Sequence, residues 1–322
     1  MIQRLTHVIA AVAMACVAIS AHGQSYPTRP VRMVVPFAPG GGTDISARVL
    51  AEGLTKTLGQ TVVVDNRPGA GSTLGTDLVA KASADGYTIL LGNISMAFNA
   101  ALYRKLPYDT LSDLTAISLV SDQPNILVGH PSMAAKTLGE FVALARSQPG
   151  KLTYGSAGNG SGTHLAMELL LMSQRMDLVH VPFKGTGPAL TALLGNQISV
   201  FFSTYASALP HVKSNRLRAY AVTSVKRTTT LPDVPTVAES GVPGYEYSTW
   251  YGLLAPAGVP KPIIEKLSQA TMSVLEMPDV RQRYLSQGMD PVPTTPAEFT
   301  KLIRSEMEKW GKVVKAAKIP LL

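Results

Sequence analysis

Short apolar runs alternate with amphipathic helical patterns along most of this chain, and this alternation constrains the fold more than any other feature. In the first part the alternating segments are 31–36, 43–58, 61–64, 72–81 and 88–91. The rhythm starts again at 126–128, 138–146, 152–154, 162–173, 179–181, 188–194, 198–202 and 218–222. Strands that alternate with helices predict parallel, doubly wound sheets. The sequence therefore predicts an α/β fold of two doubly wound lobes, with a cleft between them where strand carboxyl ends meet.

A helical tail follows the second lobe. A strand candidate at 247–254 leads to helical patterns at 261–275, 278–287 and 296–317. Because an amphipathic tail needs a surface that covers its apolar face, we expect it to pack on the first lobe. The chain would then cross between the lobes near 121–126 and 245–252. The predicted division is lobe 1 from 24–124 and 248–322, and lobe 2 from 125–247.

Residues 1–23 have the pattern of a secretory signal peptide. A basic residue precedes an uncharged apolar run from Val8 to Ile19, and small residues precede Gln24. The run of about 12 residues is shorter than the roughly 20 that span a bilayer. The alternatives are a buried first helix and a lipoprotein modified at Cys16, the only cysteine. We expect export to the periplasm and a mature chain without a thiol.

The chain is basic, with a formal net charge of +8. Nucleic-acid-binding surfaces usually cluster Lys and Arg among aromatic residues. Here the basic residues are scattered, with Lys226 and Arg227 among the densest pairs. We therefore expect no nucleic-acid partner, and a general positive field that favours small anions.

A glycine-rich segment at 36–44, the first glycine loop, separates the first strand candidate from the first helix. Its glycines let backbone N–H groups approach a ligand, and the helix N-terminus adds partial positive charge. We interpret the loop as an anion cradle. The alternative is a tight turn with Thr43 or Asp44 as the helix cap. The candidate ligand-binding residues here are Phe37, Ala38, Pro39, Gly40, Gly41, Gly42 and Asp44.

A second glycine-rich segment at 155–164, the second glycine loop, also follows a strand candidate and opens a helix. Two such loops, one in each lobe, can hold both ends of one ligand across the cleft. The alternatives are a turn with Ser161 or Thr163 as N-cap, and a core position for His164. The candidates here are Ser156, Ala157, Gly158, Ser161, Gly162 and His164.

Further candidates follow other strands of the predicted sheets. Asn93 and Ser95 follow the segment 88–91, and Ser203 and Thr204 end a strand at the expected cleft edge. Lys184 is placed to pair with an anion. The alternatives are turn chemistry for the first pair and a solvated lysine at 184.

The sequence lacks the common motifs of enzymes, metal sites and cofactor sites. There is no Gly-x-Ser-x-Gly and no His-Glu-x-x-His, and the Gly-x-Gly at 158–160 is not completed into a dinucleotide-binding pattern. A hydrolase on a two-lobed α/β fold would need a nucleophile–base pair, and the sequence shows no motif for one. We therefore expect no cofactor, no metal and no enzymatic activity, and keep a secreted hydrolase as the alternative.

Several motifs together resemble one known family. They are the residues 26–32, 36–44, 64–71, 155–158, 181–185, 208–211 and 254–260. Over essentially the whole mature chain the sequence is similar to the Bordetella-uptake-gene solute-binding proteins, the extracytoplasmic receptors of tripartite tricarboxylate transporters.

The resemblance implies a type II periplasmic-binding-protein fold and a carboxylate ligand held by the first glycine loop and by residues of lobe 2. It also implies membrane transporter subunits as transient partners of a monomer. Many relatives carry an acidic residue at the position of Ser203, so this chain is expected to bind a ligand without a positive charge. A receptor without its own transporter, acting in sensing, is a further alternative.

Overall fold

The computed structural model describes residues 26–316 and Leu321. The predicted signal peptide and Cys16 lie outside the described residues. Ten strands of the described part form one sheet through the molecule, in the order β2-β1-β3-β9-β4-β7-β5-β6, with β8 and β10 paired to β4. The strands are β1 (Val31–Val35), β2 (Val62–Asn66), β3 (Thr88–Asn93), β4 (Leu114–Gly129), β5 (Thr153–Ser156), β6 (Val179–Pro182), β7 (Val200–Thr204), β8 (Arg218–Val222), β9 (Ser248–Pro256) and β10 (Asp290–Pro291).

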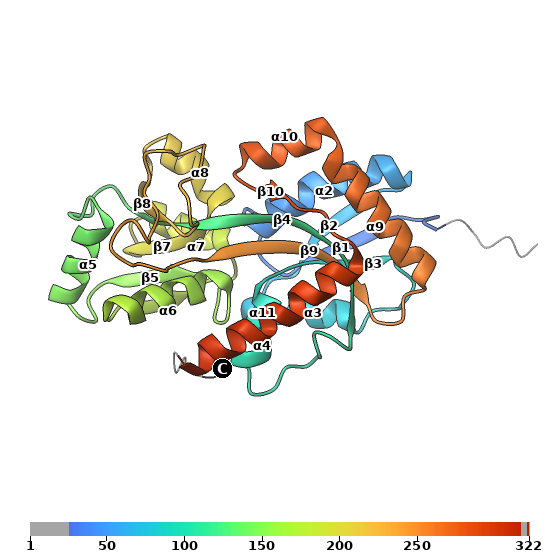
Figure 1. The fold of residues 1–322 in the computed structure, drawn as a ribbon, viewed down its shortest axis with the longest axis horizontal. Coiled ribbons are helices and arrows are strands. Elements are labelled where there is room, and N and C mark those ends of the chain that lie inside the picture. Colours follow the sequence, from blue (N-terminus) through green and yellow to red (C-terminus); the bar gives the residue numbers. More distant parts are fainter. Residues whose placement is uncertain (1–25, 317–320, 322) are drawn as a thin grey trace, which may run out of the picture.

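Lobe 1 is built on β1, which pairs in parallel with β2 and β3. Helix α2 buries Leu50 and Leu54 against α9, which contributes Leu267 and Val274. Its helices are α2 (Gly42–Leu58), η1 (Ala70–Ser72), α3 (Thr73–Ala80), α4 (Ser95–Leu102), α9 (Lys261–Glu276), α10 (Pro278–Ser286) and α11 (Pro296–Ala316). The C-terminal helices α9, α10 and α11 thus lie on the first lobe (Figure 1).

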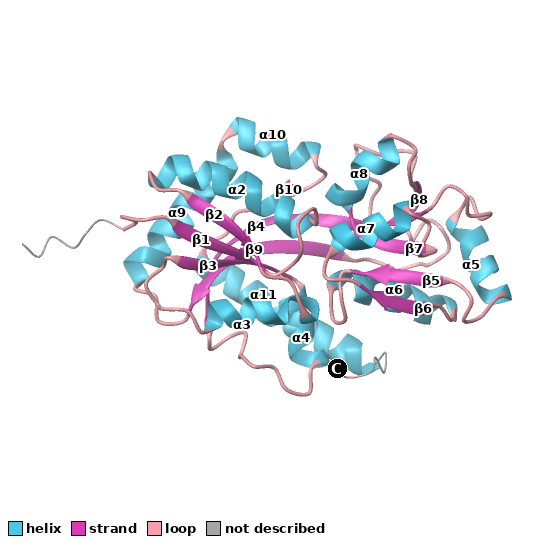
Figure 2. Ribbon diagram, turned by 180° about the vertical axis from the view of Figure 1, so that it is seen from behind, coloured by secondary structure: helices cyan, strands magenta, loops and turns pink. Residues whose placement is uncertain are grey.

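Lobe 2 is built on β5, which pairs in parallel with β6 and β7. Its helices are α5 (Leu138–Ser147), α6 (Gly162–Gln174), α7 (Thr186–Leu194) and α8 (Tyr205–Lys213). Figure 2 shows α7 and α8 on one face of this part of the sheet and α6 on the other. The predicted two-lobed α/β arrangement is therefore confirmed.

The strands β4 and β9 pass between the lobes through the middle of the molecule (Figure 1). β4 pairs with β9 from Leu114 to Pro124, and from Asn125 onward it pairs with β7 and β8. Both run antiparallel to these neighbours, a direction that the sequence pattern did not predict for the crossing strands. The reason is that a strand continuing into the other lobe needs no crossover helix to set its direction. The lobe boundaries at 124/125 and 247/248 stay a proposal, which the change of β4 partners supports.

Candidate ligand-binding site

A cavity lies between the lobes, at the carboxyl ends of strands from both of them. The space in it that admits the centre of a water molecule is about 20 Å³. That is room for about one water, so the two lobes lie closely against each other here. The lining residues are Phe37, Gly41, Gly42, Thr43, Asn93, Ala157, Ser161, Gly162, Thr163, Thr186, Thr204 and Thr249.

Helix N-termini surround this cavity. Helix α2 begins at Gly42, α6 at Gly162 and α7 at Thr186, and α8 follows Thr204 directly. The first N–H groups of a helix have no partner within it, and the helix dipole places partial positive charge there. None of the lining residues carries a charge. The cavity therefore offers dipoles and hydroxyls, a setting that favours an anion over a cation.

The first glycine loop is fixed from behind by Asp44. Its carboxylate accepts hydrogen bonds from Gly40 N–H (3.0 Å), Asn66 Nδ2 (3.0 Å) and the Arg48 guanidinium (3.0 Å). Burial opposes its ionisation, but these hydrogen bonds hold the pKa of Asp44 below its usual value. Asp44 thus stays charged and braces the loop, with its side chain outside the residues that line the cavity.

The lobes touch each other directly around the cavity. Ala38 N–H of lobe 1 donates to the Lys184 carbonyl of lobe 2 at 3.1 Å, and Gly42 N–H donates to Thr204 Oγ1 at 3.2 Å. In the opposite sense, Gly162 N–H of lobe 2 donates to Ser95 Oγ at 3.2 Å. The two glycine loops therefore belong to one site, and part of their hydrogen-bonding capacity is used across the cleft.

The second glycine loop is ordered by side chains of its own residues. Ser161 caps α6 by accepting from His164 N–H at 3.3 Å, and Thr163 Oγ1 accepts from Ala157 N–H at 2.8 Å. Both roles agree with the capping interpretation of these hydroxyls. Since Ser161 and Thr163 also line the cavity, capping and ligand contact do not exclude each other here.

The structure brings only part of the predicted set to the cavity wall. The predicted residues that line it are Phe37, Gly41, Gly42, Asn93, Ala157, Ser161, Gly162 and Thr204. The predicted residues that stand behind or beside the wall are Ala38, Pro39, Gly40, Asp44, Ser95, Ser156, Gly158, His164, Lys184 and Ser203. Whether any of them contacts a ligand stays a prediction.

Among the residues beside the wall, Lys184 is exposed, whereas Ser203 is buried and donates its hydroxyl to the Thr204 carbonyl at 3.0 Å. Thr186 and Thr249 line the cavity but were not among the predicted site residues. Thr186 lies two residues after Lys184, directly behind the motif at 181–185. Thr249 lies on β9, where an apolar strand pattern gave no signal for one inward-facing hydroxyl.

One serine–histidine pair has the spacing of a nucleophile and a base. Ser156 Oγ lies 2.6 Å from His180 Nε2, a contact that the sequence motifs did not reveal. Ser156 is fully buried and does not line the cavity, and its Oγ accepts the Gly158 N–H at 3.1 Å. The pair thus holds the backbone of the second glycine loop and does not face a substrate site.

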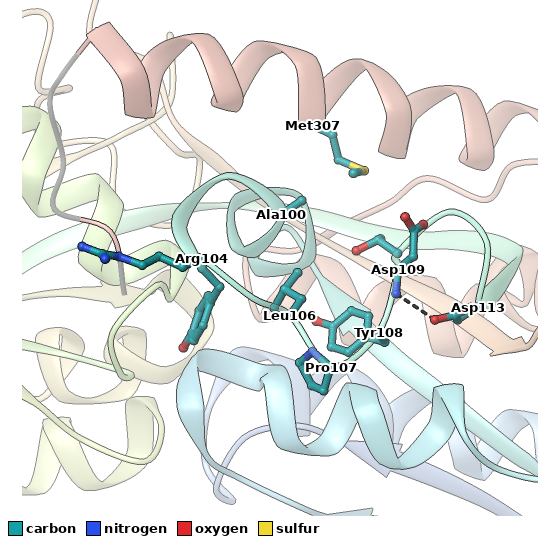
Figure 3. A pocket seen from close by; sticks show the side chains of 10 residues that line it. Ala100, Arg104, Leu106, Pro107, Tyr108, Asp109, Asp113 and Met307 are labelled. Carbon is teal, nitrogen blue, oxygen red and sulfur yellow. Dashed lines mark hydrogen bonds between the residues drawn. The ribbon is translucent and has the colours of Figure 1, made fainter.

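A second hollow of about 530 Å³ lies on the outer side of lobe 1, between α4, the segment 103–113 and Met307 of α11 (Figure 3). Its polar groups bind one another: Asp113 accepts the Asp109 N–H at 2.8 Å, and Asp109 accepts the N–H of Leu111 at 2.8 Å. No residue of the two glycine loops lines it. The cavity between the lobes is therefore the better candidate site.

Residues 26–316 and 321 contain no group of three or more His, Cys, Asp or Glu side chains placed to hold a metal ion. None of the helices in this range combines the length and the apolar character that crossing a membrane requires.

Comparisons with known proteins place this architecture in one family. A family model described as the tripartite tricarboxylate transporter family receptor matches residues 46–319. Protein BugT of Bordetella pertussis is 39% identical over 306 residues, which cover 94% of this chain and 94% of BugT.

Solved structures of similar sequence share the fold. The periplasmic binding protein BugD superposes with a TM-score of 0.90 at 36% identity, over 92% of this chain and 100% of BugD. An R. palustris protein solved with adipate gives a TM-score of 0.89 at 33% identity, over 92% and 100% of the two chains. MatC from Rhodopseudomonas palustris, solved with bound malate, gives 0.86 at 36% identity, over 90% and 100%. The type II periplasmic-binding-protein fold expected from the sequence is confirmed.

Proposed function

This chain belongs to the family of tripartite tricarboxylate transporter receptors, and on that basis we propose that it captures a small organic carboxylate in the periplasm. Members of this family are solute-binding proteins and not enzymes, and this chain is a solute-binding receptor. The ligand would be a dicarboxylate, a tricarboxylate or an aromatic acid. The receptor would then deliver it to the membrane subunits of a transporter of the tripartite tricarboxylate type.

One observation carries the proposal: an uncharged cavity between the lobes, surrounded by the N-termini of α2, α6, α7 and α8. Backbone N–H groups at helix starts hold carboxylates without a cationic side chain. Hydroxyls of Thr43, Thr163 and Thr186 can donate to the same oxygens. A ligand amino group would find no carboxylate among the lining residues, and a positively charged ligand is therefore disfavoured.

The family relation and two liganded relatives support the same class of ligand. The relatives were solved with adipate and with malate, both small dicarboxylates. With the lobes in the positions described, the cavity has room for about one water molecule, far less than the roughly 300 to 1,000 Å³ of usual ligand pockets. We therefore expect the two lobes to separate before an acid enters the site.

The test is a binding screen with mature protein freed of bound solutes by unfolding and refolding. Succinate, malate, adipate, citrate and benzoate, each beside its amide, would be compared by thermal shift and calorimetry. We expect at least one acid to raise the melting temperature, because a ligand that binds only the folded state stabilises it. We also expect its amide to bind at least tenfold more weakly, and NMR to recover the acid unchanged. Binding of the amides, with no acid bound, would refute the proposal.

A further inference from the structure

Three aromatic rings lie against one another beneath the second glycine loop. They belong to Tyr154 of β5, His180 of β6 and His164 of the first turn of α6. The His180 ring is nearly parallel to both others, at 4.7 Å from Tyr154 and 4.2 Å from His164 between ring centroids. Tyr154 is itself held by its hydroxyl, which donates to Glu168. Consecutive elements of lobe 2 therefore meet in one packed cluster behind the cavity wall.

Two backbone N–H groups of the second glycine loop donate hydrogen bonds to this cluster or to Ser156 beside it. Gly160 N–H donates to His164 Nδ1 at 3.3 Å, and Gly158 N–H donates to Ser156 Oγ at 3.1 Å. Ser156 Oγ in turn lies 2.6 Å from His180 Nε2. Gly158 and Gly160 have φ values of 126° and 73°, which side chains other than hydrogen rarely allow. The turn is thus a left-handed backbone segment held from beneath by two histidines, one directly and one through a serine.

These contacts determine which ring nitrogen carries the proton. A nitrogen that accepts an N–H or O–H bond must be unprotonated, so the His164 proton belongs on Nε2, which lies 3.8 Å from Glu168 Oε1. Ser156 Oγ already accepts the Gly158 N–H, and among the described contacts its own proton has no acceptor other than His180 Nε2. His180 then carries its proton on Nδ1. Both imidazoles are neutral, in agreement with their burial, which lowers the pKa of His164 to about 3 and that of His180 to about 4.

We infer that His164 and His180 are positioning residues: as neutral hydrogen-bond acceptors they fix residues 156–160, so that Ala157, Ser161 and Gly162 face the ligand. The cavity wall of lobe 2 is formed by residues on either side of this turn. A rotation of the turn would therefore move the α6 N-terminus away from the bound carboxylate. The inference rests on the proposed carboxylate site, but its effect on the loop does not require a ligand.

The variants that test it are His180→Phe, which keeps a ring and loses the acceptor, and Ser156→Ala, which removes the link to Gly158. His130→Phe is the matched control, because His130 Nδ1 also lies 2.6 Å from a serine hydroxyl, that of Ser132, at the far end of β4. His180→Gln restores an acceptor and serves as the conservative variant.

In the free proteins, hydrogen exchange of residues 155–164 should be faster in His180→Phe and Ser156→Ala than in wild type, and unchanged in His130→Phe. Nitrogen NMR at pH 7 should show the proton of His180 on Nδ1 and that of His164 on Nε2. The opposite tautomers, or unchanged exchange in both variants, would overturn the inference without any ligand being added.

Calorimetry with malate, or with the tightest acid of the screen above, should show that His180→Phe and Ser156→Ala each reduce the affinity about tenfold. The double variant should also lose about tenfold and not a hundredfold, since both changes break one chain of hydrogen bonds. His180→Gln should recover part of the loss. If the acid binds His180→Phe as tightly as wild type, the histidines do not position the site. If no acid binds wild type, the proposed function fails, and the exchange and tautomer results still decide whether the histidines hold the loop.

Discussion

Gly41 and Gly42 are neighbours in the chain, yet a side chain at each would meet different surroundings. Gly41 has an ordinary extended backbone, φ −86° and ψ 163°, and a β-carbon there would lie 3.4 Å from Thr186 Cβ across the cleft. A β-carbon at Gly42 would overlap the Tyr251 hydroxyl and the Gln123 amide, both of them buried. A substitution at Gly41 therefore tests the cavity, and a substitution at Gly42 tests the packing of the side chains behind it.

Gly41→Val should weaken binding of the selected acid by about tenfold or more, about 1.4 kcal/mol. The added methyl groups would occupy the space between the first glycine loop and Thr186, where lobe 2 must approach. Since Gly41 needs no left-handed backbone, the melting temperature should stay close to that of wild type. Calorimetry beside thermal melting tests this. A folded Gly41→Val protein with unchanged affinity would remove the first glycine loop from the site.

Gly42→Ala should act on stability instead. Forcing a methyl group against Tyr251 and Gln123 should lower the free energy of unfolding by about 1–3 kcal/mol, the usual cost of overpacking. Urea denaturation of the free protein measures it. Stability equal to that of wild type would show that the backbone at the start of α2 can shift without cost.

Residue types alone located both glycine loops, because each run of glycines stands between a strand pattern and a helix pattern. The same reasoning did not find His180, since nothing around it in the sequence differs from a solvated strand residue. Its role depends on Ser156 and His164, which lie 24 and 16 residues earlier in the chain. Asp44 was a candidate ligand contact, whereas its three hydrogen-bond partners come from the loop, the helix and the end of β2.

At the scale of elements, hydrophobic periodicity predicted most helices but not the crossing strand. Only 126–128 of β4 was predicted, because Ser121, Asp122, Gln123 and Asn125 interrupt its apolar pattern. Gln123 and Asn125 are nevertheless fully buried, and their amides are used by groups distant in sequence: Gln123 Oε1 accepts the Ala206 N–H at 3.0 Å. Asn125 Oδ1 accepts the Thr249 hydroxyl at 3.0 Å, whereas Asn125 Nδ2 and Asp122 Oδ1 have no hydrogen-bond partner among the described residues. A buried strand with polar side chains in tertiary contacts has no apolar period to detect.

The helices α4 and α8 were also absent from the prediction. Helix α8 starts immediately after Thr204, without a connecting turn, and contains Pro210. Both features argue against a helix when only local preferences are considered. Its start is fixed by one tertiary contact, in which Gln123 Oε1 accepts the Ala206 N–H, and by one local contact, the hydrogen bond between Thr204 Oγ1 and Ser207 Oγ.

The contact between β9 and α11 provides a test of how the C-terminal helix is attached. A β-carbon at Gly252 would overlap the ring of Phe299, which is fully buried. Gly252→Ala should therefore destabilise the protein by about 2–3 kcal/mol. Phe299→Leu in the same chain should relieve part of the clash, so the double variant should be more stable than the sum of the two single changes predicts. Additive changes in urea denaturation would contradict this packing.

For the whole molecule, the two runs of strand and helix patterns predicted the lobe arrangement, but they did not predict which ionisable side chains are buried with shifted pKa values. Asp122 lies on β4 at the crossing, in a cavity that Trp250, Glu306 and Trp310 also line. Burial, with the charges of Asp290 and Glu306, raises the pKa of Asp122 to about 6. His164 and His180 have lowered pKa values for the same reason, burial of the charged form. As the pH falls, Asp122 therefore raises the free energy of unfolding, whereas His164 and His180 lower it.

Between about pH 6 and pH 4.5 the unfolded chain binds protons at both histidines, whereas the folded chain binds one at Asp122. Each proton changes stability by about 1.4 kcal/mol per pH unit. The two histidines lose stability as pH falls and Asp122 gains it, so these three groups together should give a net loss of about 1.4 kcal/mol per unit. His211, whose pKa burial also lowers, adds to this loss. Asp122→Asn should steepen the measured loss by about 1.4 kcal/mol per unit, and His180→Phe should reduce it by about the same amount. Urea denaturation across this range measures all three slopes, and equal slopes would show that these groups are not buried as described.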